Sequence, residues 1–233
     1  MSNELEGTLP SYLVNLSSLR ILDLSNNRFR GNIASSPISN LKSTEYLLLQ
    51  YNHFQVSFKP FANHSSLKTF QANDGNELID EVASQPWTPK FQLEVFILSN
   101  YILKNSNANS LNFLHHQFEL RYLDLSGAKC SGAFPNWLLE NNTRLEIVSS
   151  ANNLFFGPFR LPSHSNPNMS VIDISQNKLQ GQIPSNISSI FPKSTDINLS
   201  ENSFQGTIPV SFGELKSLTS LDLSDNQLSG ELE

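Results

Sequence analysis

The chain has 233 residues, a formal net charge of −6 and 38% hydrophobic residues. This composition is sufficient for a buried core, and a charged fraction of 15% is too low for a disordered chain. The mild acidity, together with the lack of any cluster of Lys and Arg, argues against a nucleic-acid partner. No window carries the apolar run of a membrane span, and residues 1–6 lack the features of a secretory signal.

In chain order, short segments of the form apolar-x-apolar recur, and most are followed by Asn. The last three such Asn residues, Asn177, Asn202 and Asn226, are 25 and 24 residues apart. That spacing is typical of leucine-rich repeats, whose units are about 20–29 residues long. We predict nine repeats after an initial half unit that ends at Pro10. The nine segments are Leu22-Asp23-Leu24, Leu47-Leu48-Leu49, Phe70-Gln71-Ala72, Phe96-Ile97-Leu98, Leu123-Asp124-Leu125, Val148-Ser149-Ser150, Ile172-Asp173-Ile174, Ile197-Asn198-Leu199 and Leu221-Asp222-Leu223.

Each position of the unit has a physical reason. Side chains alternate along a strand, so the apolar pair faces one side, and stacked strands form a parallel sheet over a continuous core. The Asn amide satisfies backbone groups where the chain leaves the strand. Amphipathic helices would also explain the Leu spacing, but Asn-Asn, Gly and Pro at fixed places interrupt them. The predicted fold is an α/β-type solenoid over residues 1–233, a horseshoe with a parallel β-sheet on the concave face and irregular or 3-10 convex segments.

The middle of the chain departs from this pattern. Counting from the strands places Gly75, Tyr101 and Ala128 at the Asn position of three successive repeats. We therefore expect irregular structure at roughly 73–118, with the segment 80–90 bulging from the flank. Cys130 occupies the slot that holds Phe or Leu in other repeats. It is therefore predicted to be a small buried hydrophobe and not a reactive thiol.

The unit from Leu215 to Gly230 resembles the plant-specific class of leucine-rich repeat, and Gly-x-Ile-Pro at 181–184 and 206–209 repeats its ending. The whole chain is similar to the extracellular region of plant receptor-like proteins, and next to that of receptor kinases. The resemblance implies a plasma-membrane parent whose outer face recognises a peptide or protein ligand and signals through a co-receptor kinase in defence or development. Family members carry a signal peptide, cysteine-paired caps and a membrane span, so we expect an uncapped fragment, joined to the membrane only through other parts of its parent.

No constellation in the sequence predicts catalysis, a metal or a cofactor. His115, His116 and Glu119 lack the spacing of a zinc-binding helix and are interpreted as a polar loop. Asp residues recur at one strand position, but they belong to the repeat's Leu-Asp-Leu-Ser pattern. Convergent acid, base and nucleophile groups are missing, so the prediction is a binding module and not an enzyme.

Six Asn-x-Ser/Thr sequons occur, as expected for an extracellular glycoprotein but also by chance in a chain so rich in Asn and Ser. Five are candidate glycosylation sites, at Asn15, Asn63, Asn141, Asn168 and Asn186. The sixth, Asn198, lies between two core residues of its strand, where a glycan would block the concave face.

Solenoids of this kind bind ligands on the concave sheet. In the second to fifth repeats, the outward slots hold aromatic and aliphatic residues beside polar ones, as interface anchors do. An alternative is that these repeats are degenerate and that the apolar residues pack on their own loops. The candidate ligand-binding residues are Tyr46, Leu48, Tyr51, His53, Gln71, Asp74, Ile97 and Tyr122.

Two other functions remain open. Plant polygalacturonase-inhibiting proteins use the same repeat to block a pathogen's cell-wall-degrading enzyme, but their caps carry cysteine pairs and this chain has one cysteine. The second open function is an interaction scaffold without a receptor role. A membrane span in the flanking sequence of the parent would separate a receptor from an inhibitor.

Overall fold

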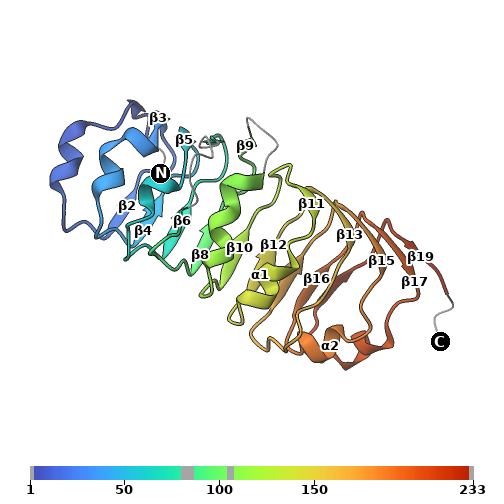
Figure 1. The fold of residues 1–233 in the computed structure, drawn as a ribbon. Coiled ribbons are helices and arrows are strands. Elements are labelled where there is room, and N and C mark those ends of the chain that lie inside the picture. Colours follow the sequence, from blue (N-terminus) through green and yellow to red (C-terminus); the bar gives the residue numbers. More distant parts are fainter. Residues whose placement is uncertain (1–2, 80–86, 104–107, 231–233) are drawn as a thin grey trace. The chain divides into compact units, whose positions relative to one another are not determined.

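The computed structural model describes residues 3–79, 87–103 and 108–230 (Figure 1). The chain divides into two compact units, Met1–Leu120 and Arg121–Glu233, called unit 1 and unit 2 below. Both are leucine-rich-repeat solenoids, in which each turn of the chain contributes a strand to a parallel ladder. One uninterrupted solenoid over 1–233 stays a prediction.

The strand ladder follows the predicted segments. In unit 1 it consists of β2 (Ile21–Asp23), β4 (Tyr46–Leu48), β6 (Thr69–Gln71) and β8 (Val95–Ile97). In unit 2 it consists of β10 (Tyr122–Asp124), β12 (Ile147–Ser149), β14 (Val171–Asp173), β16 (Asp196–Asn198) and β18 (Ser220–Asp222). The described residues therefore contain one ladder strand for each of the nine expected repeats. Neighbours within each unit pair in parallel with the apolar residues in register, as Leu47 with Phe70.

Each unit also has a second parallel sheet, which the sequence analysis did not predict. It forms where the chain runs on from the Asn turn. In unit 1 its strands are β1 (Glu6–Gly7), β3 (Arg28–Asn32), β5 (His53–Val56), β7 (Glu77–Leu78) and β9 (Ile102–Leu103). In unit 2 they are β11 (Ser131–Ala133), β13 (Leu154–Pro158), β15 (Lys178–Gln182), β17 (Ser203–Gly206) and β19 (Gln227–Leu228).

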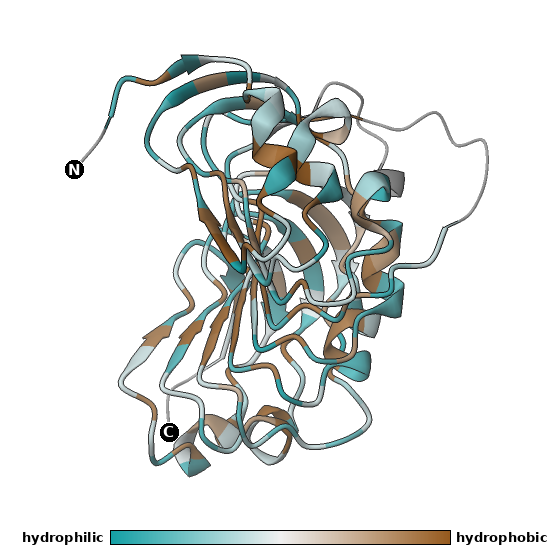
Figure 2. Ribbon diagram, turned by 90° about the vertical axis from the view of Figure 1, so that its left-hand side faces the viewer, coloured by the Kyte–Doolittle hydropathy of each residue, from teal (hydrophilic) through white to brown (hydrophobic). Residues whose placement is uncertain are grey.

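Short helices lie in the connections between the strands, and most of them are 3-10 helices, as predicted. The 3-10 helices are η1 (Ser11–Asn15), η2 (Ile33–Ser35), η3 (Pro37–Asn40), η4 (Lys59–Phe61), η5 (Ala108–His116) and η6 (Val210–Glu214). The described α-helices are α1 (Asn136–Asn141) and α2 (Ile187–Ile190). Figure 2 shows hydrophobic residues along the strands, and both hydrophobic and hydrophilic residues in the short helices and connections.

Buried Asn side chains join successive repeats. Oδ1 of Asn52 accepts a hydrogen bond from the backbone N–H of Phe29 at 3.0 Å, in the preceding repeat. Its Nδ2 donates to the carbonyl oxygens of Leu24 at 2.8 Å and Leu49 at 3.1 Å. Asn153, Asn177 and Asn202 make the same bonds in unit 2. These bonds satisfy backbone groups that the stacking of repeats removes from water.

The structure corrects the Asn position of the third repeat. Asn76, and not Gly75, accepts from the N–H of Phe54 at 2.9 Å and donates to Leu49 O at 3.0 Å. The turn is one residue longer because Asp74 and Gly75 both have positive φ, 50° and 82°. A Cβ on Gly75 would lie 2.4 Å from the carbonyl oxygen of Asn52, so this extra position requires glycine.

The region 73–118 keeps more repeat structure than predicted, with β7, β8, β9 and η5. Residues 87–94 form neither helix nor strand. The predicted bulge at 80–90 lies mostly outside the described residues, which exclude 80–86. Cys130 is buried, as predicted, and its backbone N–H donates to Asn153 Oδ1 at 2.9 Å.

Aromatic rings fill the core beneath this region. Phe113 of η5 lies against Phe58, Phe91 and Phe96, with ring centroids 4.7, 5.9 and 5.6 Å away. Phe58 also contacts Phe70 at 5.0 Å. Aromatic pairs at these separations contribute packing area and a favourable ring geometry. The cluster therefore joins β6, β8, η5 and Phe58, the residue before η4, in unit 1.

Candidate ligand-binding face

Two rows of side chains form the outer side of the ladder in unit 1. In β4, β6 and β8 the middle residue is buried and its neighbours point the other way, because side chains alternate along a strand. Parallel pairing in register aligns those neighbours across the strands. We call the two rows the strand face of unit 1. The first row is Ile21, Tyr46, Thr69 and Val95, and the second is Asp23, Leu48, Gln71 and Ile97.

The strand face of unit 1 is partly apolar. Ile21 is 60% exposed and Tyr46 is 39% exposed, whereas Leu48, Val95 and Ile97 are half-buried. Asp23 and Gln71 provide polar groups in the same rows. Apolar side chains left open to solvent beside polar ones are the usual composition of a protein-binding surface.

Four of the predicted site residues thus lie together on this face: Tyr46, Leu48, Gln71 and Ile97. Tyr51 and Asp74 occupy equivalent turns after β4 and β6, with φ of 56° and 50°. Each donates its backbone N–H to the next repeat, to Asn73 O from Tyr51 and to Ser99 O from Asp74. Tyr51 is 52% exposed at the edge of the face. His53 begins β5 of the second sheet, opposite Arg30, so it does not belong to either row.

Tyr122 belongs to unit 2, where it shares a row with Ile147 and Val171. Its ring is half-buried, and burial together with the nearby Asp124 carboxylate raises the pKa of its hydroxyl. The other row of the strand face of unit 2 is polar. It consists of Asp124, Ser149, Asp173, Asn198 and Asp222. We refer to these two rows as the strand face of unit 2.

An ion-pair network lies just before the strands of unit 1. The carboxylate of Glu45 accepts a hydrogen bond from the Arg20 guanidinium and lies 3.5 Å from Lys68 Nζ. The bond from Arg20 lowers the pKa of Glu45 against the opposing effect of burial, and the charges of Arg20 and Lys68 lower it further. Both cations are exposed, so solvent screens these ion pairs and each contributes little to stability.

The polar clusters of unit 2 do not assemble a nucleophile. The Ser163 hydroxyl donates to Glu140, and the Ser163 N–H donates to the same carboxylate at 2.7 Å. These bonds lower the pKa of Glu140, and His164 Nδ1 lies 3.7 Å away from it. Because the serine hydroxyl bonds a carboxylate and not an imidazole, no Ser–His relay forms here. Within the described residues, no group of three or more His, Cys, Asp or Glu side chains could hold a metal ion.

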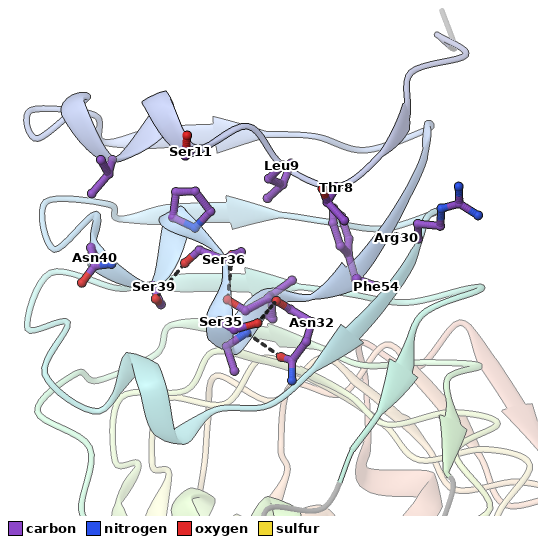
Figure 3. Close-up of a pocket in the computed structure, with 15 residues that line it drawn as sticks. Thr8, Leu9, Ser11, Arg30, Asn32, Ser35, Ser36, Ser39, Asn40 and Phe54 are labelled. Atoms are coloured by element: carbon purple, nitrogen blue, oxygen red, sulfur yellow. Dashed lines mark hydrogen bonds between the residues drawn. The ribbon is translucent and has the colours of Figure 1, made fainter.

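A crevice of about 710 Å³ lies on the flank of unit 1, between η1 and η3 (Figure 3). Several polar side chains of its lining form hydrogen bonds with nearby backbone groups. The Ser36 hydroxyl donates to Ile33 O at 2.7 Å, the Ser39 hydroxyl to Ser36 O at 2.9 Å, and Asn32 Oδ1 accepts from Ala34 N at 2.7 Å. The lining includes no residue of the strand face. These bonds define the turns of the repeat, and the crevice is a consequence of their stacking.

The sequons differ in exposure. Asn15, Asn63, Asn168 and Asn186 are exposed on the connecting segments, and Asn141, at the end of α1, is half-buried. Asn198 is half-buried on the strand face of unit 2.

Family models for the leucine-rich repeat match residues 18–41 and 167–228. Over 236 aligned residues the chain is 45% identical to Cuscuta receptor 1 of Solanum lycopersicum, covering all of this chain and 20% of that protein. It is 42% identical over 214 residues to Receptor-like protein 1 of Arabidopsis thaliana, covering 90% of this chain and 19% of that protein. The chain belongs to the plant leucine-rich-repeat receptor-like proteins. It spans about a fifth of the length of these relatives.

Among solved structures, this receptor-like protein resembles the ectodomain of the plant membrane receptor kinase GASSHO1/SCHENGEN3 from Arabidopsis thaliana, which was crystallised in complex with CASPARIAN STRIP INTEGRITY FACTOR 2. The TM-score is 0.59 at 25% identity, over 100% of this chain and 33% of that chain. The leucine-rich-repeat fold predicted from the sequence is thereby confirmed. In residues 3–79, 87–103 and 108–230, none of the helices has the length and hydropathy of a membrane span.

Proposed function

We propose that this chain is the ligand-recognition part of a cell-surface receptor-like protein, and that a peptide or protein ligand binds the strand face of unit 1. One observation carries the proposal. Ile21, Tyr46, Leu48 and Ile97 place apolar side chains in both rows of the strand face of unit 1, beside the polar Asp23 and Gln71. An apolar surface at that place gains stability when a ligand covers it.

The face suits an extended ligand. A segment that crosses the strands would meet Ile21 and Tyr46 in one row and Asp23, Leu48 and Gln71 in the other. Full burial of one exposed large apolar side chain contributes about 1.5–3 kcal/mol, and a ligand that covers Ile21 and Tyr46 would gain the part that corresponds to their exposed area. Asp23 and Gln71 would fix the register of the ligand through hydrogen bonds.

The relatives support a receptor over the rival functions. Those reported above are named as receptors or receptor-like proteins, and the structural neighbour is a receptor ectodomain with its ligand. We therefore place the parent protein in the plasma membrane, with this chain on its extracellular face. A co-receptor kinase would transmit the signal, in defence or development. The chain's own role is binding, without catalysis or cofactor.

Site-specific photo-crosslinking tests this proposal. The photoreactive residue p-benzoylphenylalanine replaces Tyr46 in one variant and Tyr12 in a matched control, because Tyr12 is exposed on η1, away from the strand face. Both proteins are secreted from plant cells, incubated with extracellular leaf fluid and irradiated. We expect a discrete adduct at position 46 that Leu48→Ala weakens, and none at position 12. Equal adducts at both positions, or none at position 46, would contradict the proposed face.

A further inference from the structure

We propose that Asn198 carries an N-linked glycan, which covers the strand face of unit 2 around β16. This inference rests on passage through the secretory pathway, as the proposed function requires. Asn198 is the sequon residue of Asn198-Leu199-Ser200 and ends strand β16. In register it lies between Asp173 and Asp222.

The folded chain leaves Nδ2 of Asn198 free to carry a sugar. Its Oδ1 accepts hydrogen bonds from the Ser200 N–H at 3.1 Å and from the Ser200 hydroxyl at 2.7 Å. Because both donors lie on the Oδ1 side, Nδ2 is directed away from the turn. The described part of the chain offers Nδ2 no hydrogen-bond partner. Nδ2 is the atom to which the sugar is attached.

The surroundings leave room for a sugar. The neighbours of Asn198 on the face are Asp173 and Asp222 across the strands and Asp196 and Ser200 along its own segment. None of these side chains is longer than aspartate. Their carboxylates accept hydrogen bonds, and sugar hydroxyls donate them. In unit 1 the equivalent residue, Leu48, has the longer side chains of Tyr46 and Gln71 as neighbours.

Asparagine at this position preserves the fold. Asp173 Oδ1 accepts from the N–H and the hydroxyl of Ser175 at 3.0 and 2.7 Å, and Asp222 does the same with Ser224 at 2.9 and 2.6 Å. Asn198 makes the identical turn with Ser200. The repeat's ordinary Asp-x-Ser turn therefore becomes a sequon with no other change in the backbone.

The modification uses a polyprenyl-diphosphate-linked oligosaccharide of the secretory pathway as donor. A bond forms between Nδ2 and C1 of the first sugar, and the bond between C1 and the diphosphate oxygen breaks. Nδ2 loses one proton, and the polyprenyl diphosphate leaves. Since transfer to the unfolded chain precedes stacking of the repeats, the role of the folded geometry is to accommodate the product.

Site mapping by mass spectrometry tests the inference. The chain is secreted from plant cells and treated with peptide N-glycosidase A in heavy-oxygen water, which labels each formerly glycosylated Asn as it becomes Asp. We expect the label at Asn198. Label at Asn15, Asn63 or Asn186 without label at Asn198 overturns this inference and leaves the proposed function standing. No label at any sequon overturns both, because the chain has then not passed the glycosylation machinery.

A matched pair of variants gives a second readout. Asn198→Asp removes the acceptor amide and keeps the turn, as Asp173 and Asp222 show, so the protein should fold and gain electrophoretic mobility by the mass of one glycan. Asp173→Asn creates the same sequon one strand away, with Ser175 as its hydroxyl residue, and should lose mobility by the same amount. Unchanged mobility of a folded, secreted Asn198→Asp protein contradicts the proposal.

Discussion

The buried Asn residues act at the scale of single atoms. Each amide pairs an N–H of the preceding repeat and carbonyl groups of both repeats, so one side chain satisfies several backbone groups at once. Asn52 is almost fully buried and Asn226 is only partly buried, although both make the same set of bonds. The energetic importance of the amide should therefore follow its burial and not its count of bonds.

Replacement of Asn52 is expected to destabilise the protein more than replacement of Asn226. Asn52→Ala leaves the Phe29 N–H without its side-chain partner in a site closed to water, at about 2–3 kcal/mol, whereas the Leu24 carbonyl still accepts from Asn27. The site of Asn226 is partly open to solvent, so Asn226→Ala should lower the free energy of unfolding by only about 1 kcal/mol. Urea unfolding followed by circular dichroism measures both. Equal losses would show that burial does not set the cost.

His64 makes stability depend on pH. Its ring is 1% exposed, Nε2 bonds Ser39 O at 2.8 Å, and Nδ1 is buried without a hydrogen-bond partner among the described residues. Burial lowers the pKa of His64 and Lys42 lowers it further, against the bond to Ser39. The unfolded chain therefore takes up a proton at a higher pH than the folded one. The stability contributed by the neutral His64 ring is fully present above the pKa that His64 has in the unfolded chain. It decreases as the pH falls below that value.

We expect the free energy of unfolding to fall between about pH 7 and pH 5, with a slope of at most about 1.4 kcal/mol per pH unit from this group. His64→Gln, whose amide can still donate to Ser39 O, should flatten the dependence. His116→Gln, which removes an exposed ring, should leave it unchanged. The measurement is chemical unfolding at a series of pH values. An unchanged slope in His64→Gln would assign the dependence to other groups.

Several residue-level features could be predicted from the sequence because each depends on one local rule. The Asn turns and the burial of Cys130 follow from the repeat alone. Asn76 could not be placed by counting, since the extra turn residue is accommodated only by two successive positive φ values, at Asp74 and Gly75. The Asp74-Gly75-Asn76 triplet was the available signal, as a glycine beside Asn favours that conformation.

At the scale of elements, the aromatic cluster explains how repeats with degenerate sequence remain packed. Tyr101 and Ala128 stand where an Asn would link neighbouring repeats, and both are buried. In unit 1, η5 compensates by placing Phe113 among Phe58, Phe91 and Phe96. Ring packing there supplies cohesion that the missing amide does not.

Phe113→Ala should therefore destabilise unit 1 by about 3–5 kcal/mol, because it leaves a cavity among Phe58, Phe91 and Phe96. Phe118→Ala is the matched control, since Phe118 follows η5 but is 52% exposed, and should cost less than about 1 kcal/mol. Thermal unfolding of both variants measures the difference. A small effect at Phe113 would mean that η5 is not held by this cluster.

The ladder strands were predictable as elements, whereas the second sheets were not. A ladder strand has an alternating pattern that repeats at every turn. A second-sheet strand such as β15 contains one buried apolar residue and Gly181. Its sequence predicts a loop, because glycine in the interior of a strand weakens it. It pairs only because the preceding Asn turn delivers the chain in register to its neighbour.

At the scale of the whole molecule, the two strand faces differ in chemistry. In unit 1 both rows contain apolar residues, whereas in unit 2 Tyr122, Ile147 and Val171 lie in one row and the other row consists of Asp, Asn and Ser. The grouping of Tyr46, Leu48, Gln71 and Ile97 was predictable, since register follows from the repeat. The position of His53 was not, because it depends on where the chain crosses to the second sheet.

A sugar on the face of unit 1 should therefore abolish ligand binding. Asp23→Asn creates the sequon Asn-Leu24-Ser25 beside Leu48, while the Asx turn to Ser25 N is retained. The control is Asp173→Asn, which adds a sugar to unit 2. We expect the photo-adduct at position 46 to disappear in the first variant and persist in the second, with both proteins secreted and glycosylated at the new site. Persistence in Asp23→Asn would place the ligand elsewhere.

The Asp-x-Ser turn that ends the strands has a consequence for how such proteins diversify. Codons for aspartate and asparagine differ in their first base alone. Within this turn that base decides whether a strand stays bare or becomes an acceptor for a sugar, while the backbone is unchanged. A lineage can therefore uncover or hide parts of its recognition surface by point mutation, without insertion, deletion or loss of folding.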